Sequence, residues 1–83
     1  MPDTILYDSA MRLFGDLVTR DVMAAAEQGV WPEELWHAVE EAGFLDVLAG
    51  GPSAVVETVT ILRAAAHHAA PIPLAETMLA RWL

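Results

Sequence analysis

The chain has 83 residues, of which 55% are hydrophobic, and it carries a formal net charge of -8 with no cysteine. The charge opposes direct binding to nucleic acid or to an anionic membrane, and the lack of cysteine excludes disulfides and thiolate metal sites. A domain of this size buries only about 60% of the surface of its unfolded chain, so we expect apolar surface to remain for a partner or for another part of the same protein.

The spacing of the apolar residues predicts an all-α fold. They recur every three or four residues, and no stretch alternates long enough to suggest a paired strand. We therefore expect residues 1–83 to form a single domain, a small bundle of about four to five helices with short connectors. No segment reaches the roughly 18 apolar residues of a membrane span. The acidic N-terminus lacks the basic region of a signal peptide, which favours a cytoplasmic protein.

The first helix is expected to begin near Asp3 or Thr4, either of which can cap it. Its apolar stripe comprises Leu6, Ala10, Leu13 and Leu17, with Phe14 and Val18 beside it. The opposite face carries two acid–base pairs with the spacing of helical ion pairs, Asp8 with Arg12 and Asp16 with Arg20. The segment 21–29 either continues this helix or bends away near Asp21, and Gly29 ends it.

The second helix has the clearest boundaries. Pro32 suits its first position, and Glu33 and Glu34 follow in the first turn, where the helix dipole favours acids. Gly43 suits the left-handed position past its end, so that Phe44 can fold back on the helix at Val39. The residues expected to face the core are Leu35, Ala38, Val39 and Ala42. Residues 44–52 are expected to form a connector.

Two further helices are predicted. The third begins near Pro52 or Ser53 and runs towards Ala69, with Val55, Val59, Leu62 and Ala66 as its apolar stripe. The fourth begins at Pro73, and Leu74, Met78, Leu79 and Trp82 follow helical spacing. It has no stop signal before Leu83. We therefore expect Met1 to be the natural N-terminus and the chain to continue beyond Leu83 in the intact protein.

The histidine doublet His67-His68 is the first candidate for a metal or proton-transfer site. Adjacent helical residues point about a hundred degrees apart, whereas metal-binding helices use a spacing of four residues. A site including the distant His37 would need further ligands converging on it. We therefore interpret the doublet as the polar end of a helix, near the negative pole of its dipole, and assign no metal ligand.

Four glutamates and three tryptophans are the next candidates. Paired carboxylates at Glu33-Glu34 and Glu40-Glu41 could serve acid–base chemistry, but the first pair suits the helix dipole and the second a solvated face. The indoles of the chain are Trp31, Trp36 and Trp82. Such side chains can form binding platforms, and more often anchor a core or an interface. We expect at least one near a surface that is covered in the intact protein.

The stretch Gly50-Gly51-Pro52-Ser53 is similar to the Gly-Gly-x-Ser of peptidyl carrier domains, which are acidic four-helix domains of about this size. There the serine carries a phosphopantetheine arm. Pro52 and Ala54 depart from the Asp or His and the Leu that usually flank it. A carrier-protein-like domain with Ser53 as the phosphopantetheine site is one alternative function, and a non-enzymatic helical interaction module is another.

Two longer stretches together resemble the acyl-CoA dehydrogenase family. "GVWPEELWHAVEEAGFLDVL" is similar to the family's Pro-x-x-Leu-Trp helix that ends in a Gly followed by apolar residues. "LRAAAHHAAPIPLAETMLARWL" is similar to the later Ala-rich helix that leads into Ala-Pro-x-Pro-Leu-Ala-Glu-Thr. Their order and separation also fit, and the resemblance covers roughly residues 13–83. The connecting segment 48–59 is shorter than is usual, which indicates a divergent member.

The resemblance implies the N-terminal helical domain of an FAD-dependent enzyme that oxidises acyl-CoA thioesters at the α,β-carbons. The implied partners are a middle β-domain and a C-terminal helical domain of the same polypeptide, with FAD and the catalytic glutamate in those parts. The chain alone would be inert, forming a wall of the acyl pocket, and we assign it no catalytic, FAD-binding or metal residue. Its exposed apolar surface could also support a homo-oligomer.

Overall fold

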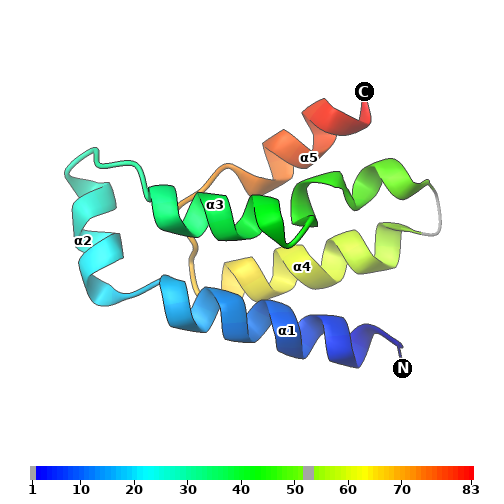
Figure 1. Cartoon of the computed structure of the whole chain (residues 1–83), viewed down its shortest axis with the longest axis horizontal. Helices are drawn as coiled ribbons and strands as arrows, with labels where there is room; N and C mark the ends of the chain where they lie inside the picture. Colours follow the sequence, from blue (N-terminus) through cyan, green and yellow to red (C-terminus); the bar gives the residue numbers. More distant parts are fainter. Residues whose placement is uncertain (1, 52–53) are drawn as a thin grey trace.

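The computed structural model of the protein describes residues 2–51 and 54–83. Within these ranges the chain forms α1 (Pro2–Leu17), α2 (Arg20–Glu27), α3 (Glu33–Glu41), α4 (Val55–His67) and α5 (Leu74–Trp82), with two short 3-10 helices, η1 (Phe44–Asp46) and η2 (Leu48–Gly50) (Figure 1). No strand occurs there, so the prediction of an all-α fold with four to five helices is confirmed. None of these helices is both long and apolar enough to cross a membrane.

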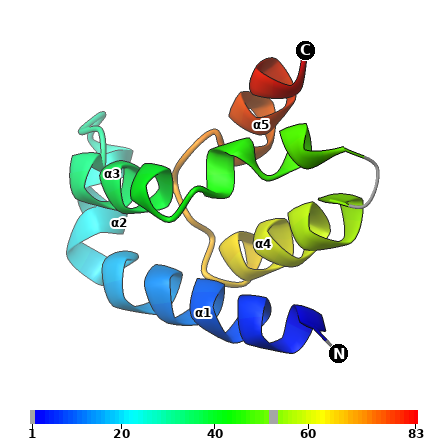
Figure 2. The same cartoon turned by 45° about the vertical axis from the view of Figure 1, so that its right-hand side comes forward.

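Helices α1 and α4 lie side by side and run in the same direction, as two views of the molecule show (Figures 1 and 2). Helix α3 packs on α1, and α5 packs on the two 3-10 helices. The shortest extent of the molecule is 18 Å, which accommodates about two layers of helices. Because the molecule is thin, its helices have outer faces that no other element covers.

The helical conformation is interrupted between α1 and α2, at Thr19. The Thr19 hydroxyl oxygen accepts a hydrogen bond from the backbone N–H of Val22 at 3.2 Å and so caps α2. The bend therefore lies just before Asp21, and Gly29 ends α2 with a φ of 84°. The predicted ion pair of Asp16 with Arg20 is wrong because the helix ends between them. Across residues 2–51 and 54–83, the predicted Asp8–Arg12 pair is not formed either.

Helix α3 follows its sequence signals closely. Pro32 stands immediately before the helix rather than at its first position, and Gly43 adopts a left-handed conformation with a φ of 78°. Phe44 turns back into the same buried cluster as Val39, as predicted. The expectation for Ala42 is wrong: it is exposed, because it lies at the very end of the helix, past the last turn that packs on the core.

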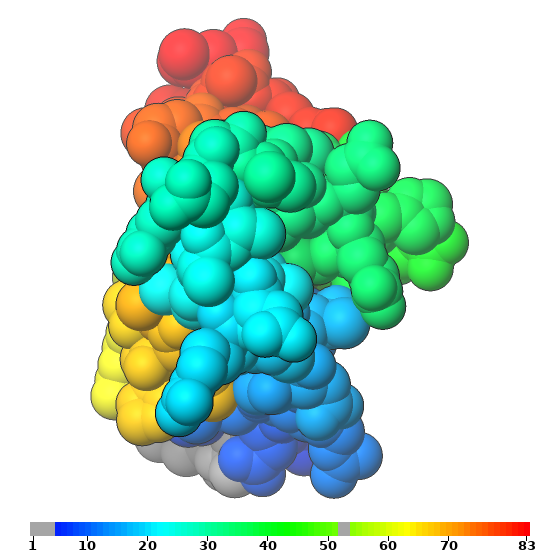
Figure 3. Space-filling model, turned by 90° about the vertical axis from the view of Figure 1, so that its left-hand side faces the viewer, coloured from blue at the N-terminus to red at the C-terminus, as the bar shows by residue number. Residues whose placement is uncertain are grey.

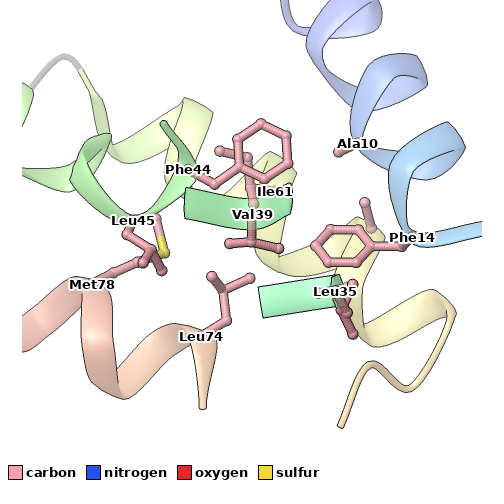
Figure 4. Close-up of a cluster of buried hydrophobic side chains, with 11 residues drawn as sticks. Ala10, Phe14, Leu35, Val39, Phe44, Leu45, Ile61, Leu74 and Met78 are labelled. Atoms are coloured by element: carbon pink, nitrogen blue, oxygen red, sulfur yellow. The ribbon is translucent and has the colours of Figure 1, made fainter. Parts of the chain in front are cut away.

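The core lies where α1, α3, η1, α4 and α5 meet (Figure 4). Its largest fully buried side chains are Phe14, Leu35, Leu45, Ile61, Met78 and Val39. The predicted stripe of α1 faces this cluster, with Phe14 and Ala10 fully buried. The segment expected to be only a connector contributes Phe44 and Leu45, since the two 3-10 helices turn these side chains inward. This segment therefore belongs to the core.

The predicted apolar face of α4 is wrong. Val55 and Val59 are 52% and 48% exposed, Ala66 is exposed and Leu62 is only half-buried. The buried residues of α4 are Thr58, Thr60, Ile61, Ala64 and Ala65. Helix α4 is apolar on most sides, so three-and-four spacing alone cannot decide which side packs on α1. We call the predicted face the α4 stripe (Val55, Val59, Leu62 and Ala66): Leu62 packs at the edge of the core cluster, and the other three side chains are exposed.

The corner between α4 and α5 differs slightly from its predicted form. Helix α4 ends at His67, before the expected Ala69, which instead adopts a left-handed φ of 51°. The N–H of Ala70 then bonds the carbonyl of Ala65 at 3.0 Å, as in a Schellman motif. Pro73 stands immediately before α5 rather than at its first position.

Helix α5 is only half packed. Leu74 and Met78 are buried as predicted, whereas Leu79 and Trp82 are 52% and 55% exposed. The helix packs on η1 and η2, and Arg81 in its last turn reaches Asp46 of η1. The predicted start of α4 at Pro52 or Ser53 falls outside the described residues.

Candidate functional site

The outward face of α3 carries two glutamates, a histidine and a tryptophan. Trp36, His37 and Glu40 lie three, four and seven residues after Glu33, so the four share one side of the helix. Leu35 and Val39 on the opposite side are buried in the core. The packing of that inner side fixes the direction in which the outer side chains point.

Trp31 precedes α3 and lies against Trp36. Their ring centroids are 5.3 Å apart and the planes meet at 63°, an edge-to-face arrangement. Trp31 remains 46% exposed, whereas Trp36 is half-buried and packs against the core cluster. The two indoles therefore form a partly exposed aromatic corner beside the helix.

Two hollows lie on either side of this corner and share Trp31 and Glu33. We call the first the apolar hollow. It has a volume of about 260 Å³, lies between α2 and the start of α3, and is lined by Leu17, Asp21, Val22, Ala25, Val30, Trp31, Pro32, Glu33, Glu34 and Leu35. The second, the indole hollow, has a volume of about 320 Å³ and is lined by Trp31, Glu33, Trp36, His37 and Glu40.

Helix α2 supplies one wall of the apolar hollow from the end of the molecule. Figure 3 shows α2 covering this end, with the segment 28–32 leading from it to α3. Within α2 no residue is fully buried. Its inward side chains Val22 and Ala25 instead line the hollow, because they have no core layer to enter.

The rims of both hollows are acidic. Across residues 2–51 and 54–83, no basic group lies within 4 Å of the carboxylates of Asp21, Glu33 or Glu34. Glu40 lies 3.8 Å from an Arg81 nitrogen, and that arginine makes its closer contact, 3.0 Å, with Asp46. The hollows therefore combine apolar walls with negative charge that the described fold leaves largely uncompensated.

The glutamates and histidines singled out from the sequence separate into different places. His37 Nε2 lies 2.9 Å from Glu41 Oε1 on an exposed helix turn, so this contact is a surface pair. Glu33 and Glu34 lie in the first turn of α3, as the sequence indicated. Within the described residues, no group of three or more His, Asp or Glu side chains is arranged to hold a metal ion.

His67 and His68 lie at the end of α4, as expected. Their ring centroids are 5.0 Å apart and the planes meet at 79°, so the two imidazoles pack edge to face. His68 is half-buried against Gly15 of α1, and its Nε2 atom is buried without a hydrogen-bond partner in the described structure. Of the two histidines, His68 therefore lies at the junction of α1 with α4, whereas His67 is exposed.

The remaining candidates lie apart from the α3 face. Trp82 is exposed near the end of α5. Ser53, the alternative phosphopantetheine site, lies outside the described residues. The two hollows were not predicted from the sequence.

Comparison of the chain with protein-family models, with curated proteins and with solved structures gives no match.

Proposed function

We propose that this chain is the N-terminal helical domain of an acyl-CoA dehydrogenase-like flavoenzyme. In the parent protein the reaction would be α,β-dehydrogenation of an acyl-CoA thioester, with the hydride passing to FAD. The domain would contribute part of the acyl-pocket wall and packing surface for the β-domain and the C-terminal helical domain. No residue of the present chain is assigned a catalytic or FAD-binding role.

One observation carries this proposal. The two stretches that resemble the family are far apart in the sequence, yet they pack together in the fold. Leu45 of the first stretch lies beside Met78 of the second within the core (Figure 4). Arg81 of the second stretch also donates hydrogen bonds to Asp46 of the first, at 3.0 and 3.3 Å. Because the two stretches pack against each other, they can both belong to one domain, as the resemblance to a single family requires.

The exposed apolar side chains fit a packing role. The α4 stripe and the end of α5 leave Val55, Val59, Leu79 and Trp82 about half exposed. Such surface is costly in water and is typical of faces that contact another domain or subunit. In the isolated chain the same surface would favour self-association, which sedimentation over a range of protein concentrations would reveal.

The test is to isolate the natural polypeptide that contains this sequence, with an antibody raised against the 83-residue chain, and to record its mass and visible spectrum. We expect a longer polypeptide that holds a flavin and whose flavin is reduced when an acyl-CoA is added. A flavin-free polypeptide of any length would contradict the proposal. The added mass of a phosphopantetheine group on Ser53 would instead establish the carrier-protein alternative.

The α4 stripe also favours a second candidate, a helical interaction module without enzymatic activity. Its uncharged side chains recur at helical spacing on an outer face, as in surfaces that dock a partner helix. The same isolation separates the two functions. A natural polypeptide of about the present mass that co-purifies with a second protein would support the module and exclude the flavoenzyme.

A further inference from the structure

We propose that the α3 face binds a peptide segment of a partner protein in which an apolar residue and a basic residue stand two positions apart. The apolar side chain would enter the apolar hollow, and the basic side chain would enter the indole hollow. This inference is independent of the flavoenzyme proposal, because it uses a surface distinct from the α4 stripe and the end of α5.

The apolar hollow has room for an apolar side chain of a partner. Its volume is about 260 Å³. Its walls include Leu17, Val22, Val30 and Leu35. A leucine or a similar side chain would find apolar contacts on several sides, as anchor residues do at protein interfaces.

The indole hollow has the chemistry of a cation site. Two tryptophan rings form its aromatic corner, and Glu33 and Glu40 supply carboxylates. A guanidinium or ammonium group is attracted both to the face of an indole and to a carboxylate. Arginine suits the site best, because its flat guanidinium stacks on the ring while its N–H groups reach the carboxylates.

Charge complementarity identifies the partner as basic. The chain carries a net charge of -8, and the acids at Asp21, Glu33 and Glu34 have no basic neighbour within 4 Å in the described fold. An acidic or neutral segment would leave these carboxylates uncompensated at the interface. A basic segment would be attracted to this face and oriented by it.

The common wall sets the spacing of the two anchors. Because the hollows share Trp31 and Glu33, their occupants must lie on adjacent sides of one indole. In an extended chain, residues two positions apart point to the same side and are about 7 Å apart. An apolar and a basic residue two positions apart, in either order, therefore suit two adjoining hollows.

The probes are the capped tripeptides Leu-Gly-Arg and Arg-Gly-Leu, each titrated into the isotope-labelled 83-residue chain while backbone amide shifts are followed by NMR. We expect a dissociation constant on the order of 0.1–1 mM, with shifts concentrated in residues 21–25 and 30–40. Replacing the arginine by citrulline, its neutral isostere, should weaken binding by about fivefold. Replacing the leucine by serine should weaken it by at least as much.

Matched variants test the two hollows. Trp31→Ala and Glu33→Gln should each weaken binding by about fivefold, while Trp82→Ala and Glu57→Gln should leave it unchanged. Trp82 is an exposed indole elsewhere, and Glu57 lies in the first turn of α4 as Glu33 does in α3. All four side chains are exposed, and the dispersion of each spectrum verifies that the variant remains folded.

Three results would overturn the proposal. One is the absence of saturable shifts up to roughly 10 mM peptide, well beyond the expected dissociation constant. Another is equal affinity for the citrulline peptide, since the cation would then have no role. The third is equal weakening by Glu33→Gln and Glu57→Gln, which would indicate only general attraction to an acidic chain.

Discussion

The imidazole ring of His68 lies against Gly15, so that a β-carbon at position 15 would meet His68 Cε1 at 3.4 Å and Nε2 at 3.6 Å. These residues come from the ends of α4 and α1, which run side by side. The small side chains of Ala64 and Ala65 are buried in the same region of α4. The close approach of the two helices at this end therefore depends on residues that occupy little space.

Replacing Gly15 tests this contact by side-chain size. We expect Gly15→Ala to stabilise the protein by about 0.5 kcal/mol, because alanine favours the helix and 3.4 Å is an ordinary contact distance. Gly15→Leu should destabilise it by roughly 1–3 kcal/mol, because the larger side chain must displace His68. Urea unfolding curves would measure both changes. Equal stabilisation by both residues would show that His68 does not restrict the position.

Gly43 and Ala69 both adopt left-handed backbone after a helix, with φ values of 78° and 51°, but only the first is glycine. We expect Gly43→Ala to destabilise the protein by about 1 kcal/mol and Ala69→Gly to stabilise it by about 0.5–1 kcal/mol. A β-carbon at Gly43 would meet no atom within 4 Å, so its cost would come from the backbone alone. Thermal melting of the two variants should shift in opposite directions, and shifts of the same sign would contradict this account.

Two buried threonines of α4 should respond differently to loss of the hydroxyl. Thr58 Oγ1 is buried without a hydrogen-bond partner in the described structure, whereas the Thr60 hydroxyl donates to the Val56 carbonyl at 2.8 Å. We expect Thr58→Val to stabilise the protein by about 1 kcal/mol, because an unpaired polar group leaves the interior. Thr60→Val should be neutral or destabilising by up to about 0.5 kcal/mol. Denaturant midpoints that favour valine equally at both positions would count against this distinction.

Shortening one side chain on each apolar face of α4 distinguishes the buried face from the exposed one. Ile61→Ala should destabilise the protein by about 2–4 kcal/mol, because it opens a cavity at a fully buried position. Val59→Ala should change stability by no more than about 0.5 kcal/mol, because the side chain is about half exposed. The measurement is the free energy of unfolding in urea. Similar losses for both variants would place Val59 in the core.

The α4 stripe can also be tested by dye binding, a measurement other than stability. Val55→Ser combined with Val59→Ser should reduce binding of a hydrophobic dye while leaving the melting temperature nearly unchanged. Ala75→Ser is a suitable control, because Ala75 is an exposed small residue on another helix. Undiminished dye fluorescence in the double variant would show that the stripe is not the exposed apolar surface that the dye detects.

Arg81 connects α5 to α3 and η1 through Glu40 and Asp46. All three side chains are substantially exposed, so we expect Arg81→Met to destabilise the protein by less than about 1 kcal/mol. The difference from the unsubstituted chain should largely disappear in about 1 M salt, which screens exposed charges. Unfolding curves at low and high salt would measure it. A loss that persists in high salt would point to packing of the arginine stem instead.

The sequence predicted α3 well because its boundaries depend on local chemistry. Proline before the helix, acids in its first turn and Gly43 after it act over a few residues, and the fold agrees with them. The face of α4 depends instead on its neighbours. Valines, alanines and threonines are distributed around all sides of this helix. Packing in the fold, including contact with α1, buries Thr60 and Ala64 and leaves Val59 exposed. No local signal in the sequence distinguishes these outcomes.

The candidate site was only partly visible in the sequence for a similar reason. The helical spacing of Glu33, Trp36, His37 and Glu40 could be read directly, whereas the hollows require the path of residues 28–32 and the position of α2. Leu45 shows the same limit, since the 3-10 turn that buries it was expected to be part of a connector. Both the hollows and the burial of Leu45 depend on how the helices pack together, which local sequence signals do not show.

Helix α2 has no fully buried residue, so the core can remain intact if this helix unfolds locally. Its backbone amides should therefore exchange hydrogen faster than those of α1 and α3, at an opening free energy well below that of global unfolding. Val22 and Ala25, which line the apolar hollow, would be exposed together in the open form. Slower amide hydrogen exchange across Arg20–Glu27 would then indicate that a ligand occupies the apolar hollow. This would hold even if the ligand leaves the rest of the protein unchanged.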